Sequence, residues 1–281
     1  MPTAVLLTAS LFIFLPTATL ADTSTSGAAP KVIQLDLFQG KQFTVDAIVG
    51  GVTRTFLFDT GEGVTMISPN VARDIGCQPW GNITGFRMTG ERMDVPRCDN
   101  VEFDFSGRRY TAPTSMVFDL GKIDPATAKL DGAVGLDLFA GKTITIQFAS
   151  RKVVLETEQS AAERVRQGIE VPIRLSRPSE GAALDVNIGV ETSHGRAWME
   201  LDSGNAGPTI FVSPQIAPLL GLRADTREPQ AITARFAPGV SLVGKARVFP
   251  DMIMDGNIGM QLMGKRDITL DLLAGRAWVG K

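Results

Sequence analysis

The feature that most constrains this chain is an internal repeat, in which three short blocks occur twice in the same order. Phe56-Leu57-Phe58 leads into Asp-Thr-Gly at residues 59–61, and Met199-Glu200-Leu201 leads into Asp-Ser-Gly at residues 202–204. The pattern Ser-Pro-x-(Val/Ile)-Ala begins at Ser68 and again at Ser213. The third block, Gly-x-(Val/Ile)-Gly, follows in both halves (132–135 and 256–259). Internal repetition normally means one structural unit used twice, and this unit is too long for a solenoid, so two similar lobes are predicted.

The composition favours β-structure in both lobes. Apolar segments are short, rich in Val, Ile, Thr and Phe, and interrupted by turn residues, with 29 glycines in the chain. A chain of 281 residues, 44% of them hydrophobic, can build a real core. We predict an all-β protein with an N-terminal lobe over 31–156, a connector with a helical turn over 157–169, and a C-terminal lobe over 170–281.

The first residues are typical of an export signal. Residues 4–15 form an uncharged apolar run that is too short to span a membrane, and a plausible cleavage site ends at Ala21. No Lys or Arg precedes the run, so a buried N-terminal strand or an uncleaved anchor is the alternative. We expect a signal peptide over 1–21, a flexible polar leader over 22–30, and an exported protein, periplasmic or secreted.

The two Asp-x-Gly triplets carry the candidate chemistry of Asp59 and Asp202. In each triplet the hydroxyl can bond the backbone or the opposite lobe, and the glycine permits a tight turn (Thr60, Gly61, Ser203 and Gly204). One triplet is a weak signal, because Asp-x-Gly is also an ordinary turn, but two at corresponding places are much stronger. Pseudo-twofold symmetry would bring the two carboxyls together, where they cannot both ionise and must share one proton.

On these residues the sequence resembles the aspartic proteases of the pepsin and retropepsin group. The resemblance rests on residues 58–61 and 201–204, and on the two hydrophobic-hydrophobic-Gly elements that end at Gly135 and Gly259. Asn257 is polar where the family usually has an apolar residue. The layout is most similar to bacterial retropepsin-like aspartyl proteases that carry the unit twice in one chain. The resemblance implies two pseudo-twofold-related β-barrel lobes with a cleft between them.

The resemblance also implies a mechanism. A water molecule held between Asp59 and Asp202 is activated by the ionised carboxylate, which acts as general base. The protonated partner donates a hydrogen bond to the scissile carbonyl and passes its proton to the leaving amine. No metal or organic cofactor is needed, the partner is a peptide or an unfolded protein, and a monomer is sufficient because both lobes lie in one chain.

A β-hairpin flap covers the substrate in this family. The best candidate here is residues 83–93, with Thr84, Gly85 and Phe86 as substrate-binding residues, because two glycines suit a mobile hairpin tip. An ordinary surface loop is the alternative. The first lobe has the longer stretch between its aspartate and its later glycine, so we expect a full flap only there.

The remaining candidate ligands and partners are few. Cys77 and Cys98 form a disulfide at the base of the flap if the compartment is oxidising, and otherwise are two buried thiols. These cysteines and the lone His194 do not make a metal ligand set. The net charge is −2 without clustered Lys or Arg, which argues against nucleic acid as a partner.

Two residues favour a different function. The residue after each triplet is usually small in the family, but here it is Glu62 in one half and Asn205 in the other. Glu62 either points to solvent or adds a third carboxylate that raises local pKa values and weakens catalysis. The alternative is therefore a catalytically weak or inactive pseudo-protease that binds peptides or a protein. A third possibility is a generic β-barrel module in which the triplets are turns, as Asp131 and Asp255 before glycine are expected to be.

Overall fold

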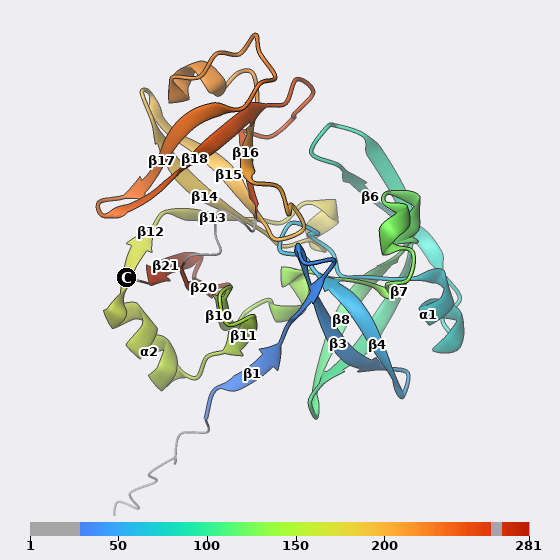
Figure 1. Cartoon of the computed structure of the whole chain (residues 1–281). Coiled ribbons are helices and arrows are strands. Elements are labelled where there is room, and N and C mark those ends of the chain that lie inside the picture. Colours follow the sequence, from blue (N-terminus) through green and yellow to red (C-terminus); the bar gives the residue numbers. More distant parts are fainter. Residues whose placement is uncertain (1–28, 260–265, 281) are drawn as a thin grey trace, which may run out of the picture.

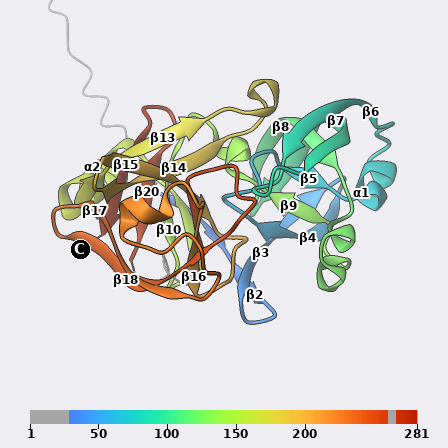
Figure 2. The ribbon, with the colours of Figure 1, turned by 90° about the horizontal axis from the view of Figure 1, so that it is seen from above.

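The computed structural model describes residues 29–259 and 266–280, so the predicted signal peptide and most of the leader lie outside the described residues. The described chain forms three β-sheets and few helices (Figure 1). One sheet belongs to each lobe, and the third is built from strands of both halves. Seen from above, the two lobes lie side by side (Figure 2). Within the described ranges, no helix has the length and apolar character needed to cross a membrane.

The first lobe is an eight-stranded sheet in the order β2-β3-β4-β9-β5-β8-β7-β6. Its strands are β2 (Asp36–Phe38), β3 (Gln42–Val49), β4 (Val52–Phe58), β5 (Met66–Ile67), β6 (Trp80–Phe86), β7 (Arg92–Phe105), β8 (Arg108–Val117) and β9 (Gly132–Val134). The helix α1 (Pro69–Asp74) begins after Ser68, whose side chain accepts a hydrogen bond from the N–H of Val71. Three short 3₁₀ helices follow: η1 (Leu120–Lys122), η2 (Pro125–Thr127) and η3 (Leu136–Phe139).

The second lobe is a seven-stranded sheet in the order β13-β14-β15-β19-β16-β18-β17. Its strands are β13 (Ile173–Ser176), β14 (Asp185–Thr192), β15 (Gly195–Asp202), β16 (Thr209–Val212), β17 (Gln230–Ala237), β18 (Val240–Val248) and β19 (Gly256–Gly259). Two 3₁₀ helices, η4 (Ser179–Gly181) and η5 (Ala217–Leu220), lie in its loops. His194 lies in the tight turn between β14 and β15.

The third sheet joins the halves in the order β1-β11-β10-β20-β21-β12. Its strands are β1 (Lys31–Gln34), β10 (Thr143–Gln147), β11 (Lys152–Leu155), β12 (Gly168–Val171), β20 (Ile268–Asp271) and β21 (Arg276–Gly280). Strands β10 and β20 meet at its centre, where the buried hydroxyls of Thr145 and Thr269 are 2.9 Å apart. The predicted connector contains α2 (Glu158–Gln167), which Thr157 and Ser160 begin with a capping box.

The two lobes pair their strands in the same way around the candidate site. In the first lobe β4 runs parallel to β9, β9 antiparallel to β5, and β5 parallel to β8. In the second lobe β15 runs parallel to β19, β19 antiparallel to β16, and β16 parallel to β18. Asp59 directly follows β4 and Asp202 ends β15, so equivalent strands deliver the two aspartates. One continuous apolar core, from Ile33 to Val279, holds these strands in place.

Candidate active site

Asp59 and Asp202 lie side by side at the junction of the lobes. Asp59 is only 9% exposed, and its Oδ1 accepts hydrogen bonds from the N–H of Gly61 (2.9 Å) and of Gly204 (3.0 Å). Because Gly204 belongs to the second triplet, the Asp59 carboxyl reaches across to the opposite lobe. Asp202 lies close enough for its charge to raise the pKa of Asp59. The folded chain thus brings together the two carboxyls singled out in the sequence.

The third residue of each triplet must be glycine for this approach. A Cβ atom at Gly61 would lie 2.8 Å from Cγ of Asp202, and one at Gly204 would lie 2.6 Å from Cγ of Asp59. Side chains essentially never make contacts that short, so any residue larger than glycine would push the carboxyls apart. The glycines serve close approach between lobes and not only the turns.

The second residue of each triplet fastens one lobe to the other. The Thr60 hydroxyl accepts from the N–H of Ser203 (3.0 Å) and donates to the carbonyl of Leu201 (2.6 Å). The Ser203 hydroxyl accepts from the N–H of Thr60 (2.9 Å) and donates to the carbonyl of Phe58 (2.9 Å). These four buried hydrogen bonds link the two lobes in both directions beneath the carboxyl pair. Together they form a hydroxyl lattice, which fixes the spacing of the two lobes.

The environment of the pair favours one retained proton. Burial raises the pKa of Asp59 well above its usual value, and the nearby charge of Asp202 raises the pKa further. Hydrogen bonds from the backbone N–H groups of Gly61 and Gly204 oppose this rise but do not overcome it. Two carboxyls this close compete for a single proton, and the pair titrates as a unit.

Four further carboxyls surround the pair. Burial, followed by repulsion from Asp59, raises the pKa of Glu62 well above its usual value. Burial raises the pKa of Asp137 to about 6, and burial with repulsion from Asp137 raises the pKa of Asp185 to about 7. Burial and repulsion from Asp202 raise the pKa of Glu200 well above its usual value. These four groups are therefore largely neutral in mild acid.

No metal-binding geometry arises from this cluster. Among the residues that the structure describes, no group of three or more His, Cys, Asp or Glu side chains is arranged to hold a metal ion. Several of the carboxyl oxygens already have protein partners, as Oδ1 of Asp137 does in accepting from the hydroxyl of Thr65 (2.6 Å).

A polar network lies behind Asp202, and the unusual Asn257 was the only hint of it in the sequence. Asn257 is 1% exposed, and its Nδ2 donates to Oδ2 of Asp202 (2.7 Å) and to Oε2 of Glu200 (3.1 Å). Nδ2 of Asn205 donates to Oδ1 of Asn257 (2.8 Å), and the N–H of Asn205 donates to Oδ1 of Asp202 (2.9 Å). Asn205 is therefore a partner of the candidate pair, and not only a departure from the family pattern.

Asp131 and Asp255 do more than form turns, which corrects the expectation drawn from the sequence. Oδ2 of Asp131 accepts from the N–H of Thr55 (3.0 Å), and Oδ2 of Asp255 accepts from the N–H of Trp198 (2.8 Å). Each acceptor thus binds the strand four residues before an aspartate of the pair. Asp131 also pairs with the buried guanidinium of Arg54 (3.5 Å). These carboxylates hold the strands that present the candidate site.

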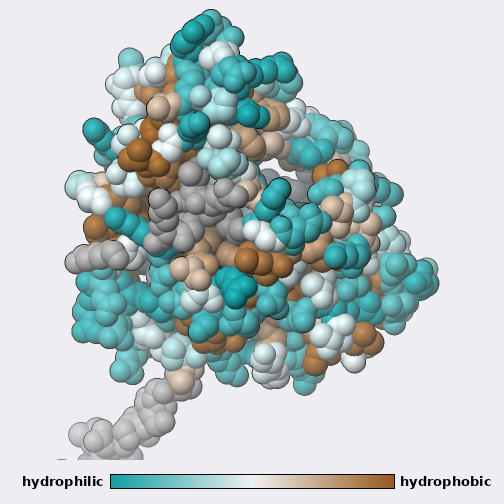
Figure 3. Space-filling view, in the orientation of Figure 1, coloured by the Kyte–Doolittle hydropathy of each residue, from teal (hydrophilic) through white to brown (hydrophobic). Residues whose placement is uncertain are grey.

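The predicted flap is a β-hairpin of β6 and β7 that extends to the second lobe (Figure 1). At its tip the carbonyl of Met88 accepts from the N–H of Ile253 (3.0 Å), which belongs to the other lobe. Nearer its base, Ile83 packs with Val64 and Ala183 in a small apolar cluster. The hairpin is therefore attached to both lobes. Figure 3 shows a hollow between the upper lobe and the lobe on the right.

The three predicted flap residues differ in their surroundings. The hydroxyl of Thr84 donates to Oδ1 of Asp94 on the neighbouring strand (2.6 Å), so it is engaged within the hairpin. A Cβ at Gly85 would lie 3.5 Å from the hydroxyl of Ser179 in η4. The Phe86 side chain is 62% exposed. Contact with a substrate therefore stays a prediction for all three.

Cys77 and Cys98 form a disulfide, as the oxidising-compartment alternative required. The bridge ties the segment before β6 to the middle of β7, at the base of the hairpin. Beside it lies a cavity of about 530 Å³ between the hairpin and η4, where the guanidinium of Arg97 stacks 4.1 Å from the ring of Trp80. Trp80 is 53% exposed, so it is not the core residue that tryptophan usually is.

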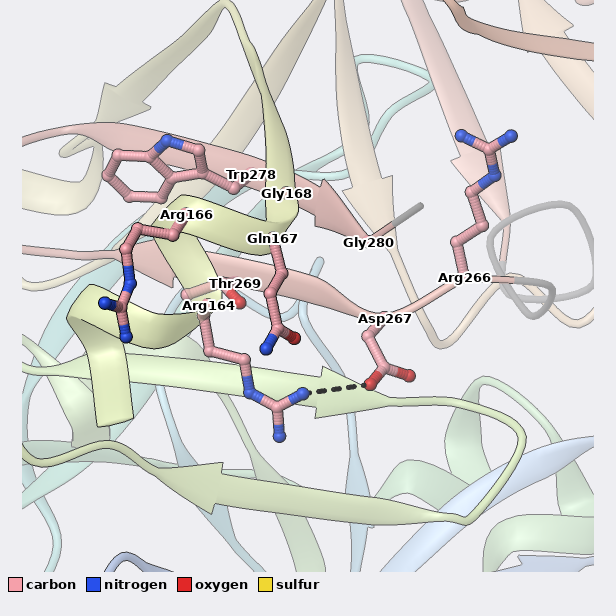
Figure 4. A pocket seen from close by; sticks show the side chains of 9 residues that line it. All are labelled: Arg164, Arg166, Gln167, Gly168, Arg266, Asp267, Thr269, Trp278 and Gly280. Atoms are coloured by element: carbon pink, nitrogen blue, oxygen red, sulfur yellow. Dashed lines mark hydrogen bonds and ion pairs between the residues drawn. The ribbon is translucent and has the colours of Figure 1, made fainter. Parts of the chain in front are cut away.

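Another cavity, of about 560 Å³, lies away from the pair, between α2 and the third sheet (Figure 4). Its lining includes three arginines, Arg164, Arg166 and Arg266, and the ring of Trp278. Arg164 pairs with Asp267 (3.5 Å) and with Glu156 (3.1 Å). These ion pairs give Arg164 a structural role, because they link α2 to Asp267 beside β20 and to Glu156 after β11.

Comparison with known proteins places the fold among aspartic-protease-like structures. Residues 45–138 match the family model described as "Aspartyl protease", and no curated protein matches the chain. Basic 7S globulin from soybean superimposes with a TM-score of 0.55 at 8% identity, over 89% of this chain and 94% of its own. Conglutin gamma, a basic 7S globulin from lupine seeds, gives 0.54 at 7%, over 90% and 95%. The likeness confirms the predicted fold, a pepsin-like arrangement of two β-rich lobes.

Proposed function

We propose that this chain is an aspartic-type endopeptidase that hydrolyses peptide bonds through Asp59 and Asp202. The observation that carries the proposal is the pair itself: two neighbouring carboxyls from equivalent strands, with the pKa of Asp59 raised by burial and by its partner. The match of residues 45–138 to the aspartyl protease model supports it. Equivalent strand ends and reciprocal hydroxyl bonds explain why a single chain can build the pair.

The chemistry follows from one proton shared by two acids. The ionised carboxylate takes a proton from a water molecule, and the water oxygen bonds to the scissile carbonyl carbon. The other carboxyl gives its proton to the carbonyl oxygen, which yields a tetrahedral gem-diol. The C–N bond then breaks as the newly protonated carboxyl protonates the leaving amine, and a gem-diol proton returns to its partner. One water is consumed, and one carboxylic acid and one amine are released.

This chemistry sets a pH range. Catalysis requires one proton on the pair, and the raised pKa of Asp59 keeps that proton bound in mild acid. Activity should therefore be highest at acidic pH and fall as the pH rises and the last proton leaves. On the acid side, activity falls when both carboxyls are protonated.

We extend the proposal to substrate and setting. The substrate is a peptide or an unfolded protein, because an extended segment can enter once the hairpin tip leaves the loop at Ile253. The disulfide supports export to an oxidising compartment, periplasmic or extracellular. Both halves of the pair come from one chain, so a monomer is the active form.

The test is cleavage of a mixed peptide library between pH 3 and 7 by purified protein. Asp59→Asn and Asp202→Asn should each abolish cleavage, because either amide removes an acid that the cycle uses. Asp225→Asn is the matched control, since that aspartate is exposed and pairs only with Arg223 in the described chain. Full activity in either pair variant would refute the proposal.

A second candidate function is peptide binding without cleavage. The half-buried Glu62, next to the first triplet, favours it, because a further carboxyl beside the pair competes for protons and raises the local pKa values. An inhibitor that mimics the tetrahedral intermediate separates the two functions. Binding of a pepstatin-type inhibitor together with turnover supports the endopeptidase. Binding with no turnover, and recovery of turnover in Glu62→Ser, supports a site inhibited by Glu62.

A further inference from the structure

The two lobes differ at one register position next to the pair. In the first lobe Leu57 lies opposite Ala133 across the parallel strands β4 and β9. At the same position in the second lobe Glu200 lies opposite Asn257 across β15 and β19. An apolar pair thus lies behind Asp59, and a polar pair lies behind Asp202.

The amide of Asn257 has a fixed orientation. The N–H of Gly207 donates to Oδ1 of Asn205 (3.0 Å), so Nδ2 of Asn205 is the group that faces Asn257. Oδ1 of Asn257 must then be the acceptor for that Nδ2 (2.8 Å), which leaves Nδ2 of Asn257 for the carboxyls. Reversing the amide would set two NH₂ groups against each other. Asn257 is therefore an obligate donor to Asp202 and Glu200.

The donors are distributed unequally over the two aspartates. Asp202 receives one on each oxygen, from the N–H of Asn205 on Oδ1 and from Nδ2 of Asn257 on Oδ2. Asp59 also receives two donors, but both bond to Oδ1, and within the described ranges no hydrogen bond to its Oδ2 is found. Oδ2 of Asp59 can therefore carry the proton, whereas both oxygens of Asp202 act as acceptors, so the geometry favours the negative charge on Asp202.

The titratable groups around the pair do not reverse this preference. Those that face Asp202 are Asp59 and Glu62 on the loop after β4, Asp185 on β14 and Glu200 on β15, with Asp137 beyond them. All are acids that burial and mutual repulsion keep protonated in mild acid. The side-chain amide of Asn257 does not titrate, so it donates to Asp202 at every pH. The neighbouring carboxyls can donate only while they are protonated.

We infer that Asn257 is a positioning residue that places the negative charge of the pair on Asp202 and leaves the proton on Asp59. This inference rests on the proposed function for its catalytic meaning. Asp202 is then the general base that takes the proton from water. Asp59 is the acid that protonates the carbonyl oxygen.

The kinetic test compares Asn257→Ala, which matches the alanine at the equivalent position of the first lobe, with wild type. Without the donor, ionised Asp202 is less favourable, so the acid limb of the kcat/KM profile should move up by about one pH unit, about a tenfold loss of rate on that limb. Thr269→Val is the matched control. It removes a buried side-chain hydrogen bond in the third sheet and should lower stability without moving the limb. An unmoved acid limb in a folded Asn257→Ala would overturn the inference.

A second measurement does not depend on turnover. The side-chain carboxyl carbons of ¹³C-labelled aspartate are followed by NMR against pH, with signals assigned from Asp59→Asn and Asp202→Asn. In wild type the Asp202 signal should change at lower pH than the Asp59 signal, and Asn257→Ala should shrink that gap. Ionisation of Asp59 before Asp202 in wild type overturns the inference even if the variant fails to fold. Absence of turnover in wild type refutes the endopeptidase alone, since the NMR order still decides the role of Asn257.

Discussion

The hydroxyl lattice beneath the pair gives a quantitative prediction about what holds the two lobes at their catalytic spacing. Thr60 is 2% exposed, and its hydroxyl bonds two backbone groups of the other lobe, the N–H of Ser203 and the carbonyl of Leu201. Thr60→Val keeps the shape of the side chain and removes only this oxygen. The substitution therefore isolates the lattice from packing effects.

The magnitude follows from the groups that lose a partner. A buried backbone group left without a hydrogen bond costs about 1–3 kcal/mol, so two such groups cost about 2–6 kcal/mol. Typical folded domains are stable by only about 5–15 kcal/mol, so the loss is a large fraction of the total. Thr55→Val is the control, because that hydroxyl bonds only the exposed Asp46, and it should cost less than about 0.5 kcal/mol.

The assay is urea unfolding followed by fluorescence, combined with a double-mutant cycle. Thr60→Val and Ser203→Ala should together cost less than the sum of the single losses. Once one hydroxyl is gone the triplets separate, and the other hydroxyl no longer reaches its partners. Additive losses, or a Thr60→Val protein as stable as Thr55→Val, would show that the lattice does not hold the lobes.

Three further predictions concern pH, glycine and the disulfide. The pKa of Asp185 is raised from 3.8 to about 7, so its stability contribution is fully present below about pH 4 and is lost as pH rises through about 7. Asp185→Asn should therefore be more stable than wild type at pH 7, by roughly 1–2 kcal/mol in urea unfolding, with little gain at pH 4. Gly204→Ala should reduce kcat at least a hundredfold in the peptide assay, because its Cβ would displace the carboxyl of Asp59. The double variant Cys77→Ser, Cys98→Ser should lower the unfolding free energy by about 3 kcal/mol and speed proteolysis within the hairpin. Reduction of the wild-type disulfide should reproduce both effects.

The parts of the site that were predictable are those encoded within a few consecutive residues. Each residue of the first triplet indicates one feature of the site. The Asp marks the end of an apolar strand, the hydroxyl residue supplies a hydrogen-bonding group, and the Gly permits a close approach. Its second copy, on Asp202, predicted the encounter, and the hydrogen bonds across the lobes provide it. The two glycines in residues 83–93 likewise predicted a hairpin, which β6 and β7 form.

The parts that were not predictable depend on contacts between distant segments. Asn257 was visibly unusual in its block, but its donor role depends on the register that sets it opposite Glu200, far away in the chain. The contact of the hairpin tip with Ile253 depends on how far two loops extend, and no local pattern encodes that reach. Asp131 was expected in a turn for its glycine neighbour, yet its carboxylate binds Thr55 on the neighbouring strand β4, 76 residues away in the chain.

The two lobes are related by near-twofold symmetry, and the residues that depart from this symmetry have a separate effect on the site. A perfectly twofold pair would share its proton equally and would have no preferred base. The residues after the triplets show where the symmetry stops: the N–H of Asn205 donates to the carboxylate of Asp202, whereas the N–H of Glu62 donates to the backbone carbonyl of Asp59 (3.4 Å). Together with the amide of Asn257, this difference places a donor on each oxygen of Asp202, whereas both donors to Asp59 bond to a single oxygen. The scaffold thus sets the distance between the acids, and the residues that break its symmetry set the direction in which the proton moves.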